Sequence, residues 1–376
     1  MAKQKTDPQT PPDNPPPPIT SMMDRPDISQ LQAQANGAPR QSLQGFDEDY
    51  VDIVDYIIRC THKIWEERAM GLIYTHYAHN AKMHTSEGLV YGREAWVVGS
   101  INALAAFPDR KLHADDVIWS GNDQDGFHTS HRMTITATNT GYTRYGAPTG
   151  KSVIYQVIAN CFVKANRISE EWVVRDELTL VRQLGFDPQQ AITDFADQPS
   201  PEGTTSETFG ATERLQGQDA PLIYQPQSSN HFDIEDFVRQ VMHELWNWRL
   251  FNKIDDYFIE TYQCHTCPSK EIYGRSDYLA HILDWLVPFP DGHVLIDHLY
   301  WLGNDEDGYR VACRWSFVGT HRGYGKYGAP TGKRVRIIVI THFWVKDGKF
   351  VEEWMIFDEL ALRQQLYIPS VVENEI

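Results

Sequence analysis

Two stretches of this 376-residue chain are nearly identical, and they decide how the rest is interpreted. Residues 141–151 read GYTRYGAPTGK and residues 323–333 read GYGKYGAPTGK, so nine of the 11 positions agree at an offset of 182. The stretch is not a phosphate-binding loop, because its glycine spacing differs and strand-like sequence follows it instead of a helix. Repetition at one fixed offset indicates a duplicated domain.

The same offset aligns short motifs on both sides of this loop. Phe-Pro-Asp and Gly-Asn-Asp recur upstream and Asp-Glu-Leu recurs downstream, with no gap between residues 107 and 178. We therefore expect two copies of one domain, each of ordinary domain size. The expected boundaries are 48–186 for the first copy, 187–230 for a linker and 231–368 for the second copy.

The N-terminal segment differs in composition from both copies. Nine of the 21 prolines lie in the first 40 residues. Such a segment cannot assemble an apolar core, so we expect residues 1–45 to form a disordered, proline-rich tail.

Each copy has the same expected order of elements. A helical segment comes first, at about 50–80 and 234–262, and a second helix follows a Tyr-Gly-Arg motif. Apolar runs then predict four strands in each copy, which favours an α+β fold with a curved antiparallel sheet around helices. The expected strands are 113–120, 127–138, 152–164 and 168–176, with counterparts at 295–302, 309–320, 334–346 and 350–358.

The composition excludes some classes of partner. The chain has 51 acidic residues against 34 lysines and arginines, a formal net charge of −17. We expect no nucleic-acid partner, because binding phosphates needs a basic face, although an anionic small ligand in one pocket is not excluded. We expect no membrane contact, because no apolar run reaches about 18 residues. We expect no signal peptide, because residues 1–18 are polar and proline-rich and lack an apolar core. Five scattered cysteines suit a reducing compartment, so we expect a cytoplasmic protein.

The end of each copy resembles a known family. The pattern is Glu-Trp, three residues, Asp and a Leu-rich helix, at 171–184 and 353–366, after the Gly-rich loops at 138–151 and 320–333. It resembles the SnoaL-like polyketide cyclase or ester cyclase family of the NTF2-like fold. The resemblance implies two tandem cone-shaped α+β barrels with the pocket inside each cone. Because members of the family commonly pair sheet to sheet, it also implies an internal pseudo-dimer of the two domains, and leaves a homo-oligomer open.

Asp176 and Asp358 are the expected catalytic carboxylates. Alternation along the last strand places Trp172 on the face of Asp176, and Trp354 on the face of Asp358. We expect this face to lie inside the cone, where burial raises the pKa of a carboxyl group and suits it to proton transfer. The resemblance implies the same role, as acid and base on an enolisable carbon. The alternative is that both aspartates cap the helix that follows.

Three histidines are expected to orient or polarise the substrate. His84 and His265 each precede Thr, in the strand that the resemblance places at the pocket. His342 lies in the strand before the Asp strand, and Asn160 replaces it in the first copy, where we expect it to contact the substrate. We therefore expect the second copy to have the more complete site. The alternative is that each histidine is a buried side chain with structural hydrogen bonds.

Aromatic side chains and two arginines complete the expected pocket. Arg132 and Arg314 occupy matching strand positions and suit a carboxylate or phenolate, although an ion pair with neighbouring glutamates is the interpretation we favour. A flat ring would contact aromatic side chains in both copies, and the alternative is that most of them simply pack in the core and the loops. These are Trp65, Trp246, Tyr145, Tyr327, Trp172 and Trp354.

The sequence indicates neither a metal nor a cofactor. Cys264 and Cys267 flank His265, but a structural zinc site needs four ligands and no second cysteine pair exists. We therefore expect a cofactor-free lyase, isomerase or cyclase that acts on a small aromatic or polyketide-like molecule. A formaldehyde-releasing (retro-aldol) lyase or a dehydratase of an aromatic side chain would use the same residues. A non-catalytic ligand-binding or scaffold protein is the second class.

Overall fold

The computed structural model describes residues 41–196, 204–205, 224–226 and 231–367. Nearly all of the expected proline-rich tail and most of the expected linker lie outside these residues. No helix within the described ranges is long and apolar enough to cross a membrane.

The first domain begins with a helix that Asp52 caps, by accepting a hydrogen bond from the Asp55 amide at 2.7 Å. The apolar side of this helix is buried against the sheet. The elements in chain order are α2 (Ile53–Trp65), η3 (Met70–Leu72), α3 (Ile73–His76), β1 (Tyr77–Thr85), β2 (Gly88–Tyr91), α4 (Arg93–Ala106), β3 (Lys111–Asn122), β4 (Gly126–Thr138), β5 (Ser152–Lys164), β6 (Arg167–Arg175) and α5 (Glu177–Leu184).

The second domain repeats this order after a connection whose described part contains α6 (Pro188–Ala196) and β7 (Thr204–Thr205). Its first helix continues into one turn of π-helix, η4. The elements are α8 (Ile234–Met242), η4 (His243–Asn247), η5 (Phe251–Lys253), α9 (Ile254–Tyr257), β8 (Phe258–Thr266), β9 (Lys270–Tyr273), α10 (Gly274–Leu286), β10 (His293–Asn304), β11 (Gly308–Thr320), β12 (Arg334–Lys346), β13 (Lys349–Phe357) and α11 (Glu359–Tyr367).

The two sheets have matching topologies. The strand order is β3-β4-β5-β6-β1-β2-β7 in the first domain and β10-β11-β12-β13-β8-β9 in the second, and each sheet is open. The expected α+β class and tandem arrangement are confirmed. One pairing in each sheet is parallel, β1 with β6 and β8 with β13, because a helical crossover separates β1 and β8 from the antiparallel strands that follow.

The first helical segment of each copy is shorter than we expected. The helix α2 ends at Trp65 and Arg68 adopts a positive φ of 64°, while Arg249 does the same with a φ of 59° in the second domain. The chain then makes only short helical turns before β1 and β8 begin. The apolar residues of these two strands prolong a helix-like pattern, which is why periodicity alone misplaced the boundary.

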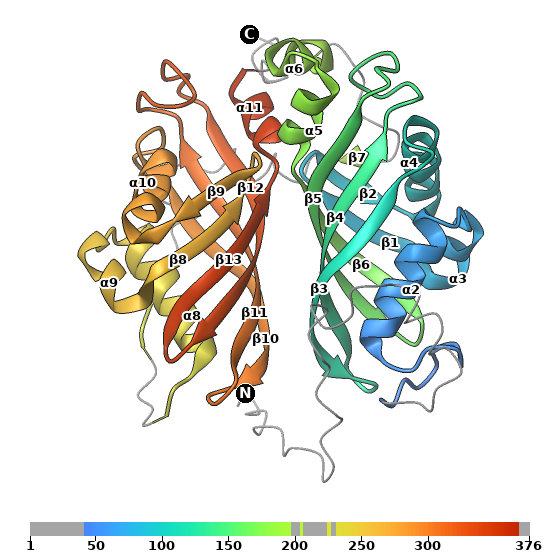
Figure 1. Ribbon diagram of the computed structural model, residues 1–376, viewed down its shortest axis with the longest axis horizontal. Helices are drawn as coiled ribbons and strands as arrows, with labels where there is room; N and C mark the ends of the chain where they lie inside the picture. Colours follow the sequence, from blue (N-terminus) through green and yellow to red (C-terminus); the bar gives the residue numbers. More distant parts are fainter. Residues whose placement is uncertain (1–40, 197–203, 206–223, 227–230, 368–376) are drawn as a thin grey trace, which may run out of the picture.

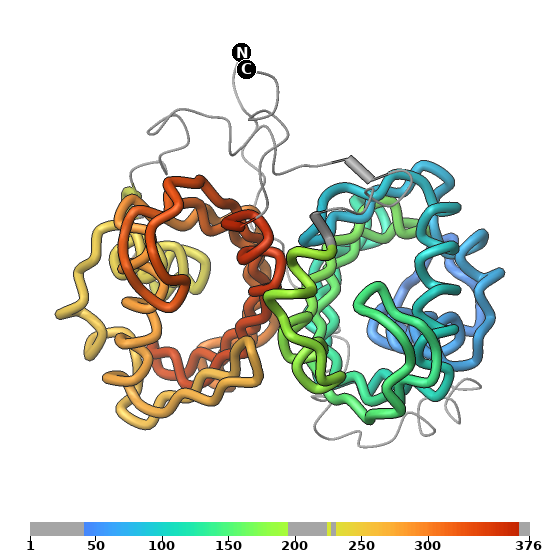
Figure 2. Tube along the Cα trace, turned by 90° about the horizontal axis from the view of Figure 1, so that it is seen from above, coloured from blue at the N-terminus to red at the C-terminus, as the bar shows by residue number. Residues whose placement is uncertain are grey.

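The two sheets face each other across the middle of the molecule, with the helices of each domain on the outer sides (Figure 1). Ile158 and Val174 of the first sheet belong to the core cluster of the second domain. Viewed from above, α5 and α6 lie against α11 where the two rounded domains meet (Figure 2). Each sheet is therefore covered on both faces, by its own helices and by the other domain.

Candidate active site

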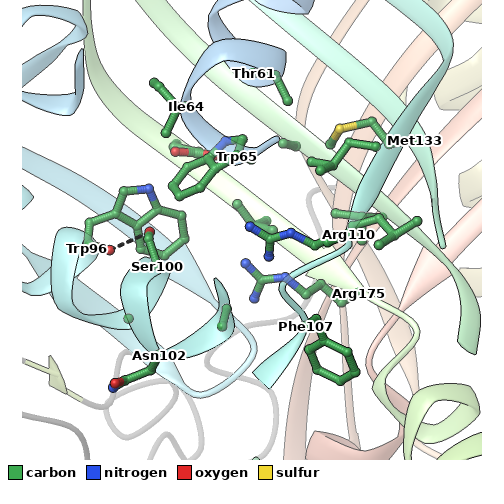
Figure 3. A pocket seen from close by; sticks show the side chains of 18 of the residues that line it. Thr61, Ile64, Trp65, Trp96, Ser100, Asn102, Phe107, Arg110, Met133 and Arg175 are labelled. Atoms are coloured by element: carbon green, nitrogen blue, oxygen red, sulfur yellow. Dashed lines mark hydrogen bonds between the residues drawn. The ribbon is translucent and has the colours of Figure 1, made fainter. Parts of the chain in front are cut away.

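The first domain encloses a cavity of about 380 Å³ between its curved sheet and the helices α2 and α4. Trp65 from α2 and Trp96 from α4 form an aromatic wall, with their ring centres 6.3 Å apart and the rings nearly perpendicular (Figure 3). A second cavity of about 670 Å³ adjoins it beside β2 and α4 and shares Trp96, Arg175 and Glu177 with the first. An enclosed, largely aromatic space with a few charged groups is typical of a small-molecule site.

The face of β6 that lines the cavity carries Glu171, Val173 and Arg175. Trp172 points to the opposite face, where the guanidinium carbon of Arg314 from the second domain lies 3.5 Å from its ring centre. Our expectation that Trp172 lies inside the cone is therefore wrong. The alternation was right, but both faces of this strand are buried, so hydrophobicity did not show which face is the interior.

The second domain repeats this arrangement. Trp354 also lies on the outer face, with the Arg132 guanidinium carbon 4.1 Å from its ring centre. Arg132 in addition lies 3.7 Å from the Asp115 carboxylate. The two arginines and two tryptophans that we assigned to substrate binding instead make cation–π contacts between the domains.

Glu171 is the buried acid of the cavity. Its carboxylate accepts a hydrogen bond from the Tyr77 hydroxyl at 2.8 Å. Burial raises the pKa of Glu171 to about 7, although the Tyr77 hydrogen bond and the Arg175 charge act in the opposite direction. Burial also lowers the pKa of the nearby His131 to about 3, so this imidazole stays neutral. A carboxyl group with a pKa near 7 both takes up and releases protons at neutral pH.

Two arginines lie together in the same cavity. The guanidinium groups of Arg110 and Arg175 lie side by side and point in the same direction in Figure 3. Burial, the largest cause, and the charge of Arg175 lower the pKa of Arg110. The Arg110 guanidinium carbon lies 5.9 Å from the ring centre of Trp65. Within the described residues, the Nε and Nη2 atoms of Arg110 have no hydrogen-bond partner, and Arg175 forms no side-chain hydrogen bond or ion pair.

Two further acids, Glu177 and Asp358, line the adjoining cavity. The Tyr145 hydroxyl donates to the Glu177 carboxylate at 2.6 Å. Asp358, from the second domain, lines the adjoining cavity and caps α11 by accepting from the Ala361 amide at 2.9 Å. Burial and the charge of Glu177 raise the pKa of Asp358 to about 7. Asp358 thus caps a helix, as the alternative held, and it also lines a cavity, so its catalytic role stays a prediction.

Asp176 has a different environment. Its carboxylate accepts from the Thr179 amide at 3.1 Å, which caps α5, and from the Ser269 amide of the second domain at 2.9 Å. It lines neither of the two cavities. The capping alternative therefore describes Asp176, and the residue also joins the two domains.

His84 and His265 lie on the outer faces of their sheets. The ring of His84 stacks on Trp172 with the ring centres 4.8 Å apart, and its Nε2 lies 2.8 Å from a Glu170 oxygen. His265 stacks on Trp354 in the same way, with the ring centres 5.1 Å apart. Both histidines thus extend the layer of aromatic and arginine side chains between the domains and lie away from the cavity.

His342 and Asn160 meet in a buried cluster between the domains. The Ser130 hydroxyl donates to Asn160 at 2.6 Å and lies 2.6 Å from Nε2 of His342. The other ring nitrogen of His342 lies 3.5 Å from Asp116, which also pairs with Arg310. Burial lowers the pKa of His342. The sequence assigned His342 and Asn160 to separate pockets, whereas the structure joins them across the interface.

The corresponding interior of the second domain is packed with aromatic side chains. Trp246, an expected substrate contact, is buried against Trp285 and Trp315, with ring centres 6.2 and 5.5 Å from its own. At the offset of 182, Trp285 and Trp315 occupy the positions of Ala103 and Met133, both of which line the cavity of the first domain. We therefore place the candidate site in the first copy, although the sequence favoured the second copy as the more complete one.

The expected aromatic contacts divide in the same way between the domains. Trp65 and Tyr145 line the cavity of the first domain, and their contact with a substrate stays a prediction. Tyr327, the counterpart of Tyr145, is 2% exposed and packs against Phe289 in the core of the second domain.

The sequence analysis missed Glu171, Arg110, Arg175 and Trp96. A usable signal was present, because the repeat itself shows where the copies diverge. Arg110 and Arg175 align with Gly292 and Phe357 of the second copy. One copy has a charged residue at a core position where the other copy has an uncharged one. Such a difference indicates a candidate ligand-binding or catalytic site. Among the described residues no group of three or more metal-ligating side chains is placed to hold a metal ion.

Comparison with known proteins identifies similar domains. The family model for SnoaL-like polyketide cyclases matches residues 56–184 and 236–366. Similar solved structures include a candidate SnoaL-like polyketide cyclase from Jannaschia sp. CCS1, at 17% identity and a TM-score of 0.33, covering 38% of this chain and 100% of that chain. TsrD from Streptomyces laurentii is similar at 22% identity and a TM-score of 0.31, covering 37% of this chain and 100% of that chain. No curated protein matches at a significant level.

Proposed function

Because this chain belongs to the SnoaL-like polyketide cyclase family, we propose that it is a cofactor-free acid–base enzyme whose reaction takes place in the cavity of the first domain. Membership of the family supports a cyclase or isomerase kind of function. The observation that carries the proposal is Glu171, a buried carboxyl group with its pKa raised to about 7, on the wall of an aromatic cavity.

Glu171 would act as the proton-transfer group. Its carboxylate takes a proton from a carbon beside a substrate carbonyl, and the electron pair of the broken C–H bond forms an enolate. The positive charges of Arg110 and Arg175 in the same cavity lower the energy of an anion formed there, the enolate included. In an isomerisation the proton returns to another carbon. In a cyclisation the enolate carbon attacks a second carbonyl, and Glu171 returns the proton to the resulting alkoxide.

The walls of the cavity favour a small molecule with a flat ring. Trp65 and Trp96 meet edge to face, which leaves ring surfaces turned to the cavity. The volume of about 380 Å³ suits a ligand of one to a few rings. This supports an aromatic or polyketide-like substrate, and the retro-aldol lyase and the dehydratase remain alternatives that use the same acid.

The second domain would serve as a structural partner. Its interior positions carry Trp246, Trp285 and Trp315, all buried, where the first domain is open. Glu353, the counterpart of Glu171, is enclosed by tyrosines and a cysteine. We propose that catalysis is confined to the first domain.

A matched pair of variants tests this proposal. We expect Glu171→Gln to lower kcat/KM at least about a hundredfold on a panel of small aromatic β-dicarbonyl compounds, because general acid–base catalysis contributes about that much. Glu353→Gln makes the same change in the filled domain and should leave kcat/KM near the wild-type value. The mass of the product separates isomerisation or cyclisation from loss of water or formaldehyde. Full turnover by Glu171→Gln would show that Glu171 is not the catalytic group.

The pH profile gives a second readout. The base form of Glu171 is needed to take the proton, so kcat/KM should rise with pH and level off above about 7. A profile that is flat across this range would argue against the assignment.

A further inference from the structure

We propose that the substrate carries a carboxylate, which Arg110 and Arg175 bind together in the cavity of the first domain. The inference rests on the proposed function, since it assigns a chemical class to the ligand of the same site. The bulk charge of −17 does not oppose it, because the field inside a cavity is set by the groups that line it.

The two arginines reach the cavity from different parts of the sheet. Arg110 directly precedes β3, and its amide is held by the Phe107 carbonyl at 3.3 Å. Arg175 is the last residue of β6. The curvature of the sheet brings these ends together, and Figure 3 shows both guanidinium groups pointing toward the aromatic wall formed by Trp65 and Trp96.

The acids near the arginines are already engaged. Glu171 accepts from Tyr77, and Glu177 accepts from Tyr145. Glu66 accepts from the Lys111 ammonium at 3.0 Å and from the Leu112 amide at 2.8 Å. Glu171 is also largely protonated below a pH of about 7, which weakens it as a counter-ion. The charges of Glu66 and Glu171 act on Arg110 and Arg175 respectively, but among the described residues neither carboxylate forms an ion pair with these arginines.

Two adjacent cations in a largely apolar space are unfavourable on their own. Their mutual repulsion is stronger in a low-dielectric cavity than in water. A bound anion would remove this repulsion and satisfy the nitrogen atoms of Arg110 that have no partner among the described residues. Planar guanidinium groups match the two oxygens of a carboxylate in a bidentate geometry.

The surroundings favour a carboxylate over a phosphate. Glu177 lines the same cavity and would repel a dianion more strongly than a monoanion. The lining includes no lysine, and its third arginine, Arg144, forms an ion pair with Glu87. A single negative charge beside a flat ring fits both the cations and the walls.

The position of the pair orients the substrate. Glu171 and Arg175 lie four residues apart on one strand face, so their Cα atoms are separated by roughly 13 Å. The carboxylate of the substrate would lie near β3 and the end of β6, and its reacting carbon would lie deeper, near Glu171. The second domain has Gly292 and Phe357 at the arginine positions, so the anion site belongs to the first domain alone.

Calorimetric titration of the full chain tests the assignment with three probes that share one ring system: 2-naphthoate, 2-naphthamide and 2-naphthyl phosphate. We expect 2-naphthoate to bind most tightly. Arg110→Gln and Arg175→Gln should each raise the Kd for 2-naphthoate about tenfold or more, as expected for the loss of a charged hydrogen bond, and leave the Kd for 2-naphthamide nearly unchanged. Arg182→Gln removes an equal charge from the exposed surface of α5 and should change neither value.

Thermal unfolding provides the control for folding, and 2-naphthoate should raise the Tm of the wild type more than that of Arg175→Gln. Equal affinity for the acid and the amide, or tighter binding of the phosphate, would overturn the proposal, as would equal losses for both ligands in the arginine variants. Glu171→Gln separates the two proposals, because it should still bind 2-naphthoate. If Glu171→Gln keeps full turnover and the arginine variants still weaken 2-naphthoate binding, only the acid–base role of Glu171 is wrong. If the arginine variants do not weaken 2-naphthoate binding, the anion site is wrong whatever the turnover.

Discussion

Glu171 and Glu353 occupy equivalent positions, and their surroundings decide whether a ligand can reach the carboxyl group. Both occupy the same position of the repeat, both are buried, and burial raises the pKa of each to about 7. Glu171 faces an open cavity, whereas Glu353 faces Tyr278, whose hydroxyl lies 3.5 Å away, and the buried Tyr262. The same shifted acid is thus available to a ligand in one domain and enclosed in the other.

Glu353 should make stability depend on pH. The unfolded chain releases this proton near pH 4.5, while the folded protein holds it to about pH 7, so the free energy of unfolding falls as pH rises between these values. Gln has no such proton to lose. We expect Glu353→Gln to lose less stability than the wild type over this range, by up to about 3 kcal/mol. Urea unfolding at several pH values measures the difference, and parallel curves for the two proteins would contradict it.

At the scale of the element, the last strand and its following helix explain which aspartate reaches a cavity. Asp176 and Asp358 both cap the next helix. The second oxygen of Asp176 is taken by the Ser269 amide of the other domain, whereas Asp358 lines a cavity on the side of the first domain. Both domains therefore have the same helix cap, but the residues and cavities around the two caps differ.

Substitutions of Asp176 separate capping from catalysis. Asn keeps one acceptor oxygen and caps helices well, so Asp176→Asn should lose mainly the bond from Ser269 and about 1 kcal/mol of stability. Asp176→Ala loses both bonds and should cost about 2–4 kcal/mol. We expect kcat to stay near the wild-type value in both, measured where each is fully folded. A folded Asp176→Asn protein without turnover would restore the catalytic assignment.

At the scale of the whole molecule, the duplication yields two domains with different interiors. The outer faces of the two sheets pack on each other through stacked histidines, tryptophans and arginines. This interface uses the residues that sequence reasoning placed in the pockets. The interior of the second domain is filled by Trp246, Trp285 and Trp315, which favours a scaffold role for it.

Copying one residue from the second domain into the first tests this division. Ala103→Trp introduces the side chain of Trp285 at its equivalent position on α4, where it would occupy the cavity. We expect binding of 2-naphthoate and turnover to fall at least about tenfold while the Tm stays near that of the wild type. The reverse change, Trp285→Ala, should cost about 3–5 kcal/mol and leave turnover intact in the folded protein. Unchanged ligand binding by Ala103→Trp would place the site elsewhere.

The sequence by itself determined the duplication and the α+β class, because these follow from repeated motifs, local periodicity and turn residues. The resemblance of the Glu-Trp-Asp pattern and the Gly-rich loop indicated the family. It also placed Trp65 and Tyr145 correctly in the cavity of the first domain. Only the tertiary structure decided which face of β6 is the interior, because helices bury one face and the other domain buries the opposite one. It likewise decided that His342 meets Ser130, a residue 212 positions away, and that large aromatic rings close one of two related interiors. Alternation along a strand determines which side chains share a face, but packing between distant segments determines what that face contacts.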